Sequence, residues 1–134
     1  MKYIVETDKP LDQTLLDLQE AVKANGFGVL HTYNLKETLK SKGIDLPNEC
    51  HILEICNPKQ AAAVLAEDMD LNMALPCRIS VWGNEGGKIK IGMIPPKAIL
   101  ESLSDSPVLK EIALKVEEKM KIMIQAAKQT RKIS

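Results

Sequence analysis

The chain has 134 residues, of which 45% are hydrophobic and 27% charged, so it is long enough for one globular domain with a buried core. Eighteen Lys and Arg residues balance eighteen Asp and Glu residues, which argues against a protein that attracts nucleic acid or an acidic membrane through a general positive field. Aromatic residues make up only 3% of the chain, too few for the stacking surface of a single-strand binder. We therefore expect neither nucleic acid nor a membrane among its partners.

The amino-terminal segment and the cysteines indicate the compartment. Charged residues appear within the first six positions, before an apolar signal segment can form, and no apolar run approaches the roughly 20 residues of a membrane span. The three cysteines, Cys50, Cys56 and Cys77, are an odd number in a chain without a secretory signal, which disfavours a disulfide framework. We predict a cytoplasmic protein that forms a single domain over residues 1–134.

The first part of the chain predicts two strands, each followed by a helix. A strand over residues 2–6 leads to a helix that Asp8 caps and that ends at Gly26. Asn34 then caps a short helix that stops at Gly43. Residues 27–33 alternate as a second strand, and the side chains expected on one of its faces are Phe27, Val29, His31 and Tyr33.

A third strand and helix follow, and then a return loop. Residues 50–55 read as the strand, and the pair Asn57-Pro58 is typical of the first turn of a helix. The loop over residues 68–76 is expected to place its apolar side chains against the core, and these are Met69, Leu71, Met73 and Leu75.

The last part of the chain predicts a β-hairpin and a long helix. From Cys77 onward the inward side chains are Ile79, Val81, Ile89 and Ile91, with a turn at residues 84–87. Trp82 follows the outward parity of Ser80, so its indole is expected to be partly exposed. A short helix over residues 97–103 precedes the longest one, which Ser106 caps and Pro107 begins.

Two stretches of the chain carry a family resemblance. Glu49-Cys50-His51-Ile52-Leu53-Glu54-Ile55-Cys56-Asn57-Pro58 and Leu75-Pro76-Cys77-Arg78-Ile79 resemble the bacterial and archaeal family called domain of unknown function 302. The resemblance covers about residues 1–127 and leaves a basic tail over residues 128–134. It implies a two-layer α/β (α+β) sandwich, with helices on one curved, mostly antiparallel sheet in a shape related to TATA-binding-protein-like folds. It also implies a homodimer, and it carries over no catalytic residue. The element order that we expect along the chain is β-α-β-α-β-α-β-β-α.

Cys56 is the first candidate for chemistry. It closes the third strand directly before Asn57-Pro58, so its sulfur is expected near the positive amino end of the next helix. That environment favours the thiolate, and Lys59 would add positive charge. The alternative is that Cys56 is a small buried apolar residue at the end of a strand.

Cys77 is the second candidate, and topology decides whether the two thiols meet. If the third and fourth strands are antiparallel neighbours, Cys56 and Cys77 lie near each other, whereas parallel strands separate them. Cys50 and Cys56 are about 20 Å apart along one extended strand and cannot share an ion. We therefore predict no metal site, although an ion held by Cys56, Cys77 and an outside ligand stays open.

These residues favour a small-ligand or sulfur/redox-related binding module centred on Cys56 and Cys77, with no particular cofactor indicated. His31 is expected to be a hydrogen-bonded core residue or the partner of a thiol. One alternative is a thiol-dependent enzyme with Cys56 as its nucleophile. The other is a non-catalytic interaction or assembly protein. The ligand-binding candidates are Cys56, Asn57, Pro58, Cys77, Arg78 and His31.

Overall fold

Five antiparallel strands form the central sheet of the computed structural model, which describes residues 1–84 and 87–129. The strands lie in the order β1-β5-β4-β3-β2, so the chain's first and second strands form the two edges. The predicted turn at Glu85 and Gly86 and the end of the basic tail, residues 130–134, lie outside the described residues. The bounds are β1 Tyr3–Thr7, β2 Gly28–Asn34, β3 Glu49–Cys56, β4 Cys77–Gly83 and β5 Ile89–Met93.

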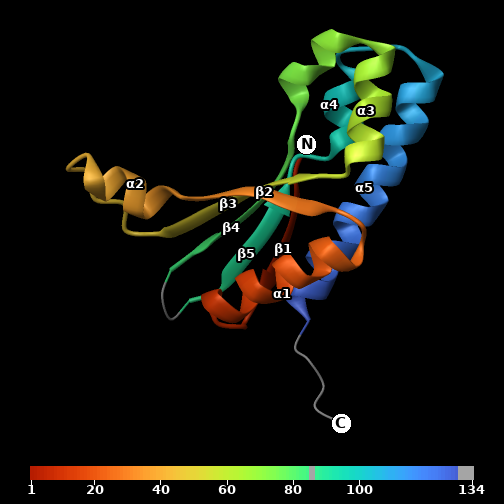
Figure 1. Cartoon of the computed structure of the whole chain (residues 1–134). Coiled ribbons are helices and arrows are strands. Elements are labelled where there is room, and N and C mark those ends of the chain that lie inside the picture. Colours follow the sequence, from red (N-terminus) through yellow and green to blue (C-terminus); the bar gives the residue numbers. More distant parts are fainter. Residues whose placement is uncertain (85–86, 130–134) are drawn as a thin grey trace.

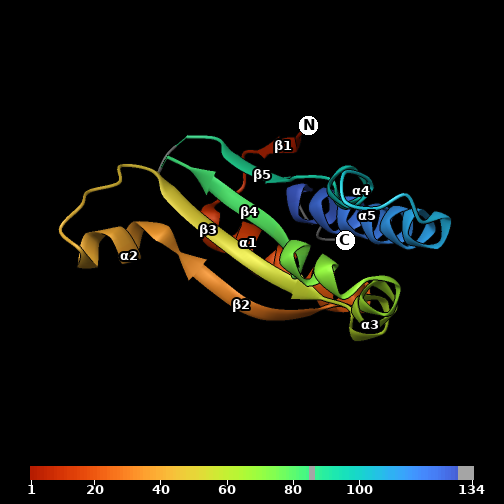
Figure 2. The ribbon, with the colours of Figure 1, turned by 90° about the horizontal axis from the view of Figure 1, so that it is seen from above.

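Helices cover one face of this sheet, and the other face is open. Helix α1 and the carboxyl-terminal end of α5 lie beneath the sheet in Figure 1, and Figure 2 looks onto the open face. No described helix combines the length and the apolar character that crossing a membrane requires. The helices are α1 Leu11–Ala24, α2 Leu35–Ser41, α3 Pro58–Glu67, the 3-10 helix η1 Met69–Ala74, α4 Pro96–Glu101 and α5 Pro107–Lys128.

The main core lies between the sheet and these two helices. Strand residues of one parity, such as Leu53, Ile79 and Ile91, are fully buried against residues of α1 and α5 such as Leu18 and Met120. Each such side chain contributes roughly 1.5–3 kcal/mol by leaving water. The inward and outward parity predicted for the hairpin is confirmed, and so is the two-layer α/β fold.

A second, smaller core lies beside the sheet. The amino-terminal half of α5 extends beyond the strands, α3 and α4 pack on it, and η1 packs against α3 and α4 (Figure 1). We call this group of helices the helical lobe. Ile112 of α5 packs against both cores and so links them. The buried residues of the lobe core are Val64, Leu71, Leu100, Leu109 and Ala113.

The side-chain caps of three helices agree with the prediction. Asn34 and Asn57 each accept a hydrogen bond at 3.1 Å, from the amides of Glu37 and Gln60, and Ser106 Oγ accepts one from the Leu109 amide at 3.3 Å. These contacts satisfy amide groups that a helix start leaves without partners.

The predicted Asp8 cap is wrong. Helix α1 begins at Leu11, and Pro10 stands at the cap position without a side-chain hydrogen bond. Asp8 therefore lies too far upstream to accept from the first-turn amides. The predicted end of this helix holds, because Gly26 follows Asn25 with a φ of +80°.

The loop predicted over residues 68–76 contains the 3-10 helix η1 instead. Only Leu71 of its apolar residues is buried, whereas Met69 and Met73 are 64% and 78% exposed. A 3-10 helix has three residues per turn, so residues spaced by two point in three different directions. Of the four side chains expected against the core, Leu71 is buried and Leu75, directly after η1, is half-buried against the lobe core, whereas the two methionines point away from it.

The predicted shared face of the second strand is also wrong, because β2 contains a bulge. Val29 pairs with Ile55, but His31 pairs with Glu54, so Leu30 is an extra residue. The extra residue reverses the alternation. His31 and Tyr33 therefore leave the face of Val29 and lie on the open face, where both are exposed.

Candidate functional site

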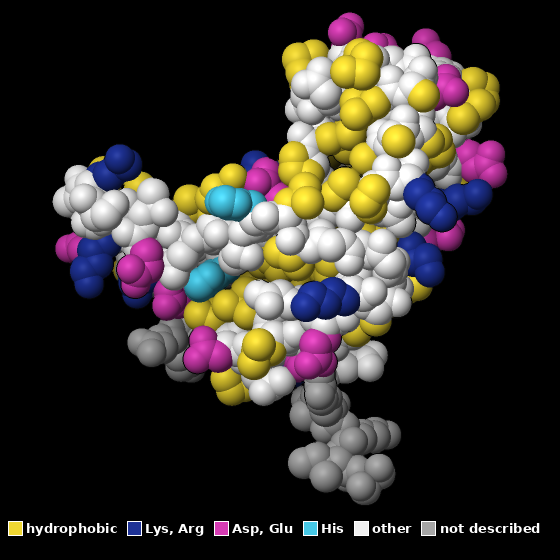
Figure 3. Space-filling view, in the orientation of Figure 1, with side chains coloured by type: hydrophobic (Ala, Val, Ile, Leu, Met, Phe, Trp, Pro, Cys, Tyr) yellow, Lys and Arg dark blue, Asp and Glu magenta, His cyan; other side chains and the backbone are white. Residues whose placement is uncertain are grey.

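Two neighbouring cavities lie where the helical lobe meets the sheet. The first, of about 410 Å³, lies over the open face between β1, β4, β5 and the lobe. The second, of about 270 Å³, lies between the ends of β2 and β3, α3 and α5. Figure 3 shows apolar side chains gathered on the lobe and at its junction with the sheet. The residues common to both linings are Leu75, Pro76, Cys77, Pro96 and Leu100.

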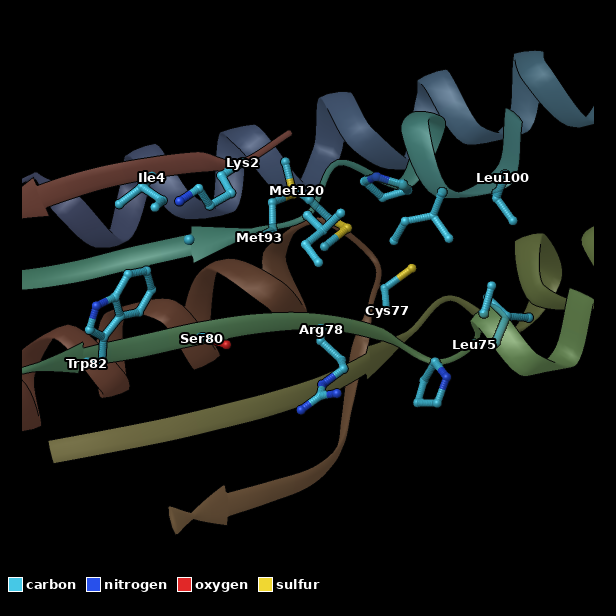
Figure 4. Close-up of a pocket in the computed structure, with 16 residues that line it drawn as sticks. Lys2, Ile4, Leu75, Cys77, Arg78, Ser80, Trp82, Met93, Leu100 and Met120 are labelled. Atoms are coloured by element: carbon cyan, nitrogen blue, oxygen red, sulfur yellow. The ribbon is translucent and has the colours of Figure 1, made fainter. Parts of the chain in front are cut away.

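Strand alternation builds the wall of the first cavity. The outward parity of β4 puts Arg78, Ser80 and Trp82 on the open face, and Ile4 of β1 lies beyond β5 (Figure 4). Gly92 of β5 makes room for the indole, because a Cβ there would lie 2.9 Å from the Trp82 ring and 3.0 Å from the Ile4 side chain. Trp82 is half-buried, in agreement with the expected partial exposure.

Charge in the first cavity comes from two cations. Lys2 and Arg78 are the charged residues among those that line it, and both are exposed. Neither forms a hydrogen bond or an ion pair with any residue that the structure describes. The lining is otherwise mostly apolar.

The two candidate thiols both line the second cavity. Strands β3 and β4 are antiparallel neighbours, with Cys77 opposite Ile55 and therefore one position from Cys56. The antiparallel pairing on which the proximity of Cys56 and Cys77 depends is therefore present, and both residues are free cysteines. Burial raises the pKa of the Cys77 thiol to about 11, and the nearby Cys56 adds to this increase.

The helix start after Cys56 has few unbonded amides. Pro58 has no N–H, the Gln60 amide donates to the Asn57 side chain, and the Ala61 amide donates to the Asn57 carbonyl at 2.9 Å. Only the Lys59 amide of this turn lacks a partner among the described residues. Most amides of this first turn are therefore already bonded to Asn57, the cap residue.

Gln60, which lines the second cavity, has a buried polar atom for which the described residues provide no partner. Gln60 Oε1 is buried and accepts no hydrogen bond from a described residue. Asn57 also lines this cavity, and its Nδ2 donates to the Gly26 carbonyl at 3.4 Å. None of the described residues that line this cavity carries an imidazole or a carboxylate.

A comparison with protein families places the fold. The family model named "Domain of unknown function DUF302" matches residues 3–127. The chain belongs to the DUF302 family. A solved structure of an uncharacterized conserved DUF302 protein from Bacillus stearothermophilus is 36% identical, with a TM-score of 0.87, and the match covers 94% of this chain and 97% of that one. No curated protein matches the chain.

The DUF302 fold brings some predicted site residues together and separates others. Cys56, Asn57 and Cys77 line the second cavity, and Cys77 and Arg78 line the first. Pro58 begins α3 outside both linings. His31 is also outside them; it lies 4.7 Å, ring to ring, from Tyr33 on the open face rather than on an apolar core face.

Metal ligands are not grouped in the described part of the DUF302 fold. No three His, Cys, Asp or Glu residues within residues 1–84 and 87–129 are placed to hold one ion. Cys50 pairs with Trp82 towards the far end of β3 from Cys56, as the strand spacing requires.

Sequence reasoning missed several residues of the site. Lys2 and Ile4 join the first cavity from an edge strand, and Gln60 joins the second from α3. The outward parity of Arg78, Ser80 and Trp82 was the available signal for the cavity wall. The alternation of outward side chains did not show which strands lie beside β4.

Proposed function

We propose that this DUF302 chain is a binding module for a small, mostly apolar molecule, which it holds in the first cavity with Cys77 in the wall. The observation that carries the proposal is the cavity of about 410 Å³, with a mostly apolar lining and a few polar groups. Binding sites for small molecules commonly have this size and composition. Cys56 belongs to the module through the adjoining second cavity.

Rigid elements support this site. Its floor is β4 and β5 in the middle of the sheet, and Met120 and Leu100 in its lining are buried in the main core and the lobe core. A preformed apolar surface of this kind binds a ligand by removing its apolar area from water, at about 25 cal/mol per Å². Because the surface is preformed, fewer side chains of the site have to become ordered when the ligand binds.

Trp82 provides the test, because it is the only tryptophan and it lines the cavity. We expect the neutral fluorescent probe N-phenyl-1-naphthylamine to bind saturably and to quench Trp82 by energy transfer. Ser80→Leu places a larger side chain in the cavity and should weaken probe binding about tenfold or more. Ser41→Leu, on the exposed surface of α2, is the matched control and should bind the probe like the original chain. Absence of saturable binding, or equal binding by both variants, would contradict the proposal.

The enzyme alternative receives less support from the geometry. A cysteine nucleophile is usually activated by an adjacent base. No imidazole or carboxylate is present among the described residues that line the cavity of Cys56. The arrangement therefore favours binding over thiol catalysis.

A further inference from the structure

We infer that the first cavity prefers a small amphipathic anion, with an apolar acyl or aryl body and one carboxylate. This inference rests on the proposed function and names the class of ligand. Its basis is the charge of the lining, where Lys2 and Arg78 are cationic and no described lining residue is acidic. An apolar chamber with two unpaired cations at its rim matches a ligand with the opposite charge at one end.

Arg78 has donors that its neighbours do not use. It stands opposite Glu54 in the register of β3 and β4, but Glu54 Oε1 instead accepts a hydrogen bond from the Tyr33 hydroxyl at 2.9 Å. This bond raises the pKa of Tyr33, whereas the positive charge of Arg78 lowers it. The guanidinium itself makes no hydrogen bond or ion pair with a described residue. Its planar fork of N–H groups fits a carboxylate with two parallel hydrogen bonds.

Lys2 supplies a second positive charge from another strand. Figure 4 shows Lys2 just before β1, with Met93 between it and Arg78, whose side chain extends from β4 towards β3. Because both cations are exposed, their effect is screened by salt. They should therefore favour anions and disfavour cations, most strongly at low ionic strength.

The apolar body of the ligand has its own surfaces. Ile4 and Trp82 lie on the sheet side of the cavity, and Leu75, Ile99 and Leu100 lie on the lobe side. Because Gly92 has no side chain, the indole of Trp82 and the side chain of Ile4 can lie close over β5. The cations at the rim thus attract the carboxylate of the ligand, and the apolar lining contacts its acyl or aryl body.

The test compares three eight-carbon compounds that differ in their head group. Octanoate, 1-octanol and octylamine, each kept below its aggregation concentration, displace N-phenyl-1-naphthylamine from the full chain at pH 7.5. We expect octanoate to bind about tenfold more tightly than 1-octanol, and octylamine to bind most weakly. Raising the salt from 50 to 500 mM should reduce the preference for octanoate and leave 1-octanol unchanged.

Variants identify the residue responsible. Arg78→Gln should remove most of the preference for octanoate without changing the affinity for 1-octanol, and Arg78→Lys should restore part of it. Arg78 is exposed, so neither change disturbs the core. Lys59→Gln is the matched control, because Lys59 is an exposed cation outside both cavity linings.

Two outcomes separate the inference from the function on which it rests. Equal affinity for octanoate and 1-octanol, or equal effects of Arg78→Gln and Lys59→Gln, would overturn the anion preference while binding persists. Failure of the three compounds and of the naphthylamine probe to bind would overturn the proposed function itself.

Discussion

Cys77 lies at the first strand position of β4, in the wall of both cavities. Its raised pKa means that it stays a neutral thiol at physiological pH and packs as a small apolar group. Burial raises the pKa of Cys50 as well. The three cysteines of the chain thus stand in different surroundings.

We predict that alkylation distinguishes these thiols. Cys56 should react with iodoacetamide first, because raised pKa values reduce the thiolate fractions of Cys50 and Cys77. A thiol of pKa about 11, such as Cys77, is roughly 0.1% thiolate at pH 8. The rate of Cys77 should therefore still be rising at pH 10. Mass-spectrometric mapping from pH 6 to 10 measures all three rates.

The same experiment tests the redox hypothesis. Cys77→Ser should leave the alkylation rate of Cys56 unchanged and abolish any Cys56–Cys77 disulfide that a mild oxidant forms. If Cys56 is labelled only after denaturation, it is a packing residue, and the sulfur and redox roles are lost. Equal labelling of Cys77 and Cys56 at pH 8 would contradict the order predicted from burial.

At the scale of elements, a buried ion pair joins the start of α1 to the end of α5. The Lys9 ammonium pairs with Asp17 and donates to the carbonyls of Ala127 at 2.7 Å and Gln129 at 2.9 Å. A cation at this position also suits the negative end of a helix. The Thr7 hydroxyl donates to the Lys128 carbonyl at 2.8 Å and reinforces the same connection.

We predict that Lys9→Met lowers the free energy of unfolding by about 3 kcal/mol, because it leaves the buried Asp17 carboxylate without its ammonium partner. Lys23→Met, at an exposed position in the last turn of the same helix, should cost less than about 0.5 kcal/mol. Urea denaturation of both variants measures the difference. Equal midpoints would show that the pair contributes nothing net.

Local signals in the sequence were sufficient for most elements. The caps at Asn34, Asn57 and Ser106 could be predicted because each lies within three residues of the amide that it binds. The bulge at Leu30 could not, because it depends on how β2 pairs with β3, and η1 could not, because its short apolar spacing also fits a loop. The buried pair of Lys9 and Asp17 depends on α5, which is distant in sequence.

The residues of the candidate site divide in the same way, into those that local sequence could indicate and those that depend on the pairing of distant strands. The motif around Cys56 and Cys77 marked both thiols but left open whether they meet, because the sequence did not show that β3 and β4 are antiparallel neighbours. Lys2 and Ile4 could not be assigned to the cavity, because β1 reaches the site only through its pairing with β5.

At the scale of the whole molecule, we propose a homodimer. Support comes from large apolar side chains that the described chain leaves exposed on the open face and around the lobe, such as Leu30, Ile94 and Met73, at 60%, 59% and 78%. Figure 3 shows apolar side chains gathered on the lobe, and exposed apolar patches commonly mark interfaces. Sedimentation velocity at micromolar concentration should give the mass of two chains, and Met73→Lys, which lies outside both cavity linings, should shift the balance towards one. A single chain at all concentrations would remove the dimer and leave the fold untouched.

The position of the cavities between two separate cores has a consequence for motion. Packed cores resist deformation, and the two cores of this molecule have separate sets of buried residues, with Ile112 packed against both. A small tilt of the lobe on α5 would therefore widen or narrow both cavities at once without disrupting either core. Since Leu75, Pro76 and Cys77 belong to both linings, a molecule seated on one side of this segment would alter the room on the other, and the two cavities would respond to occupancy as one unit.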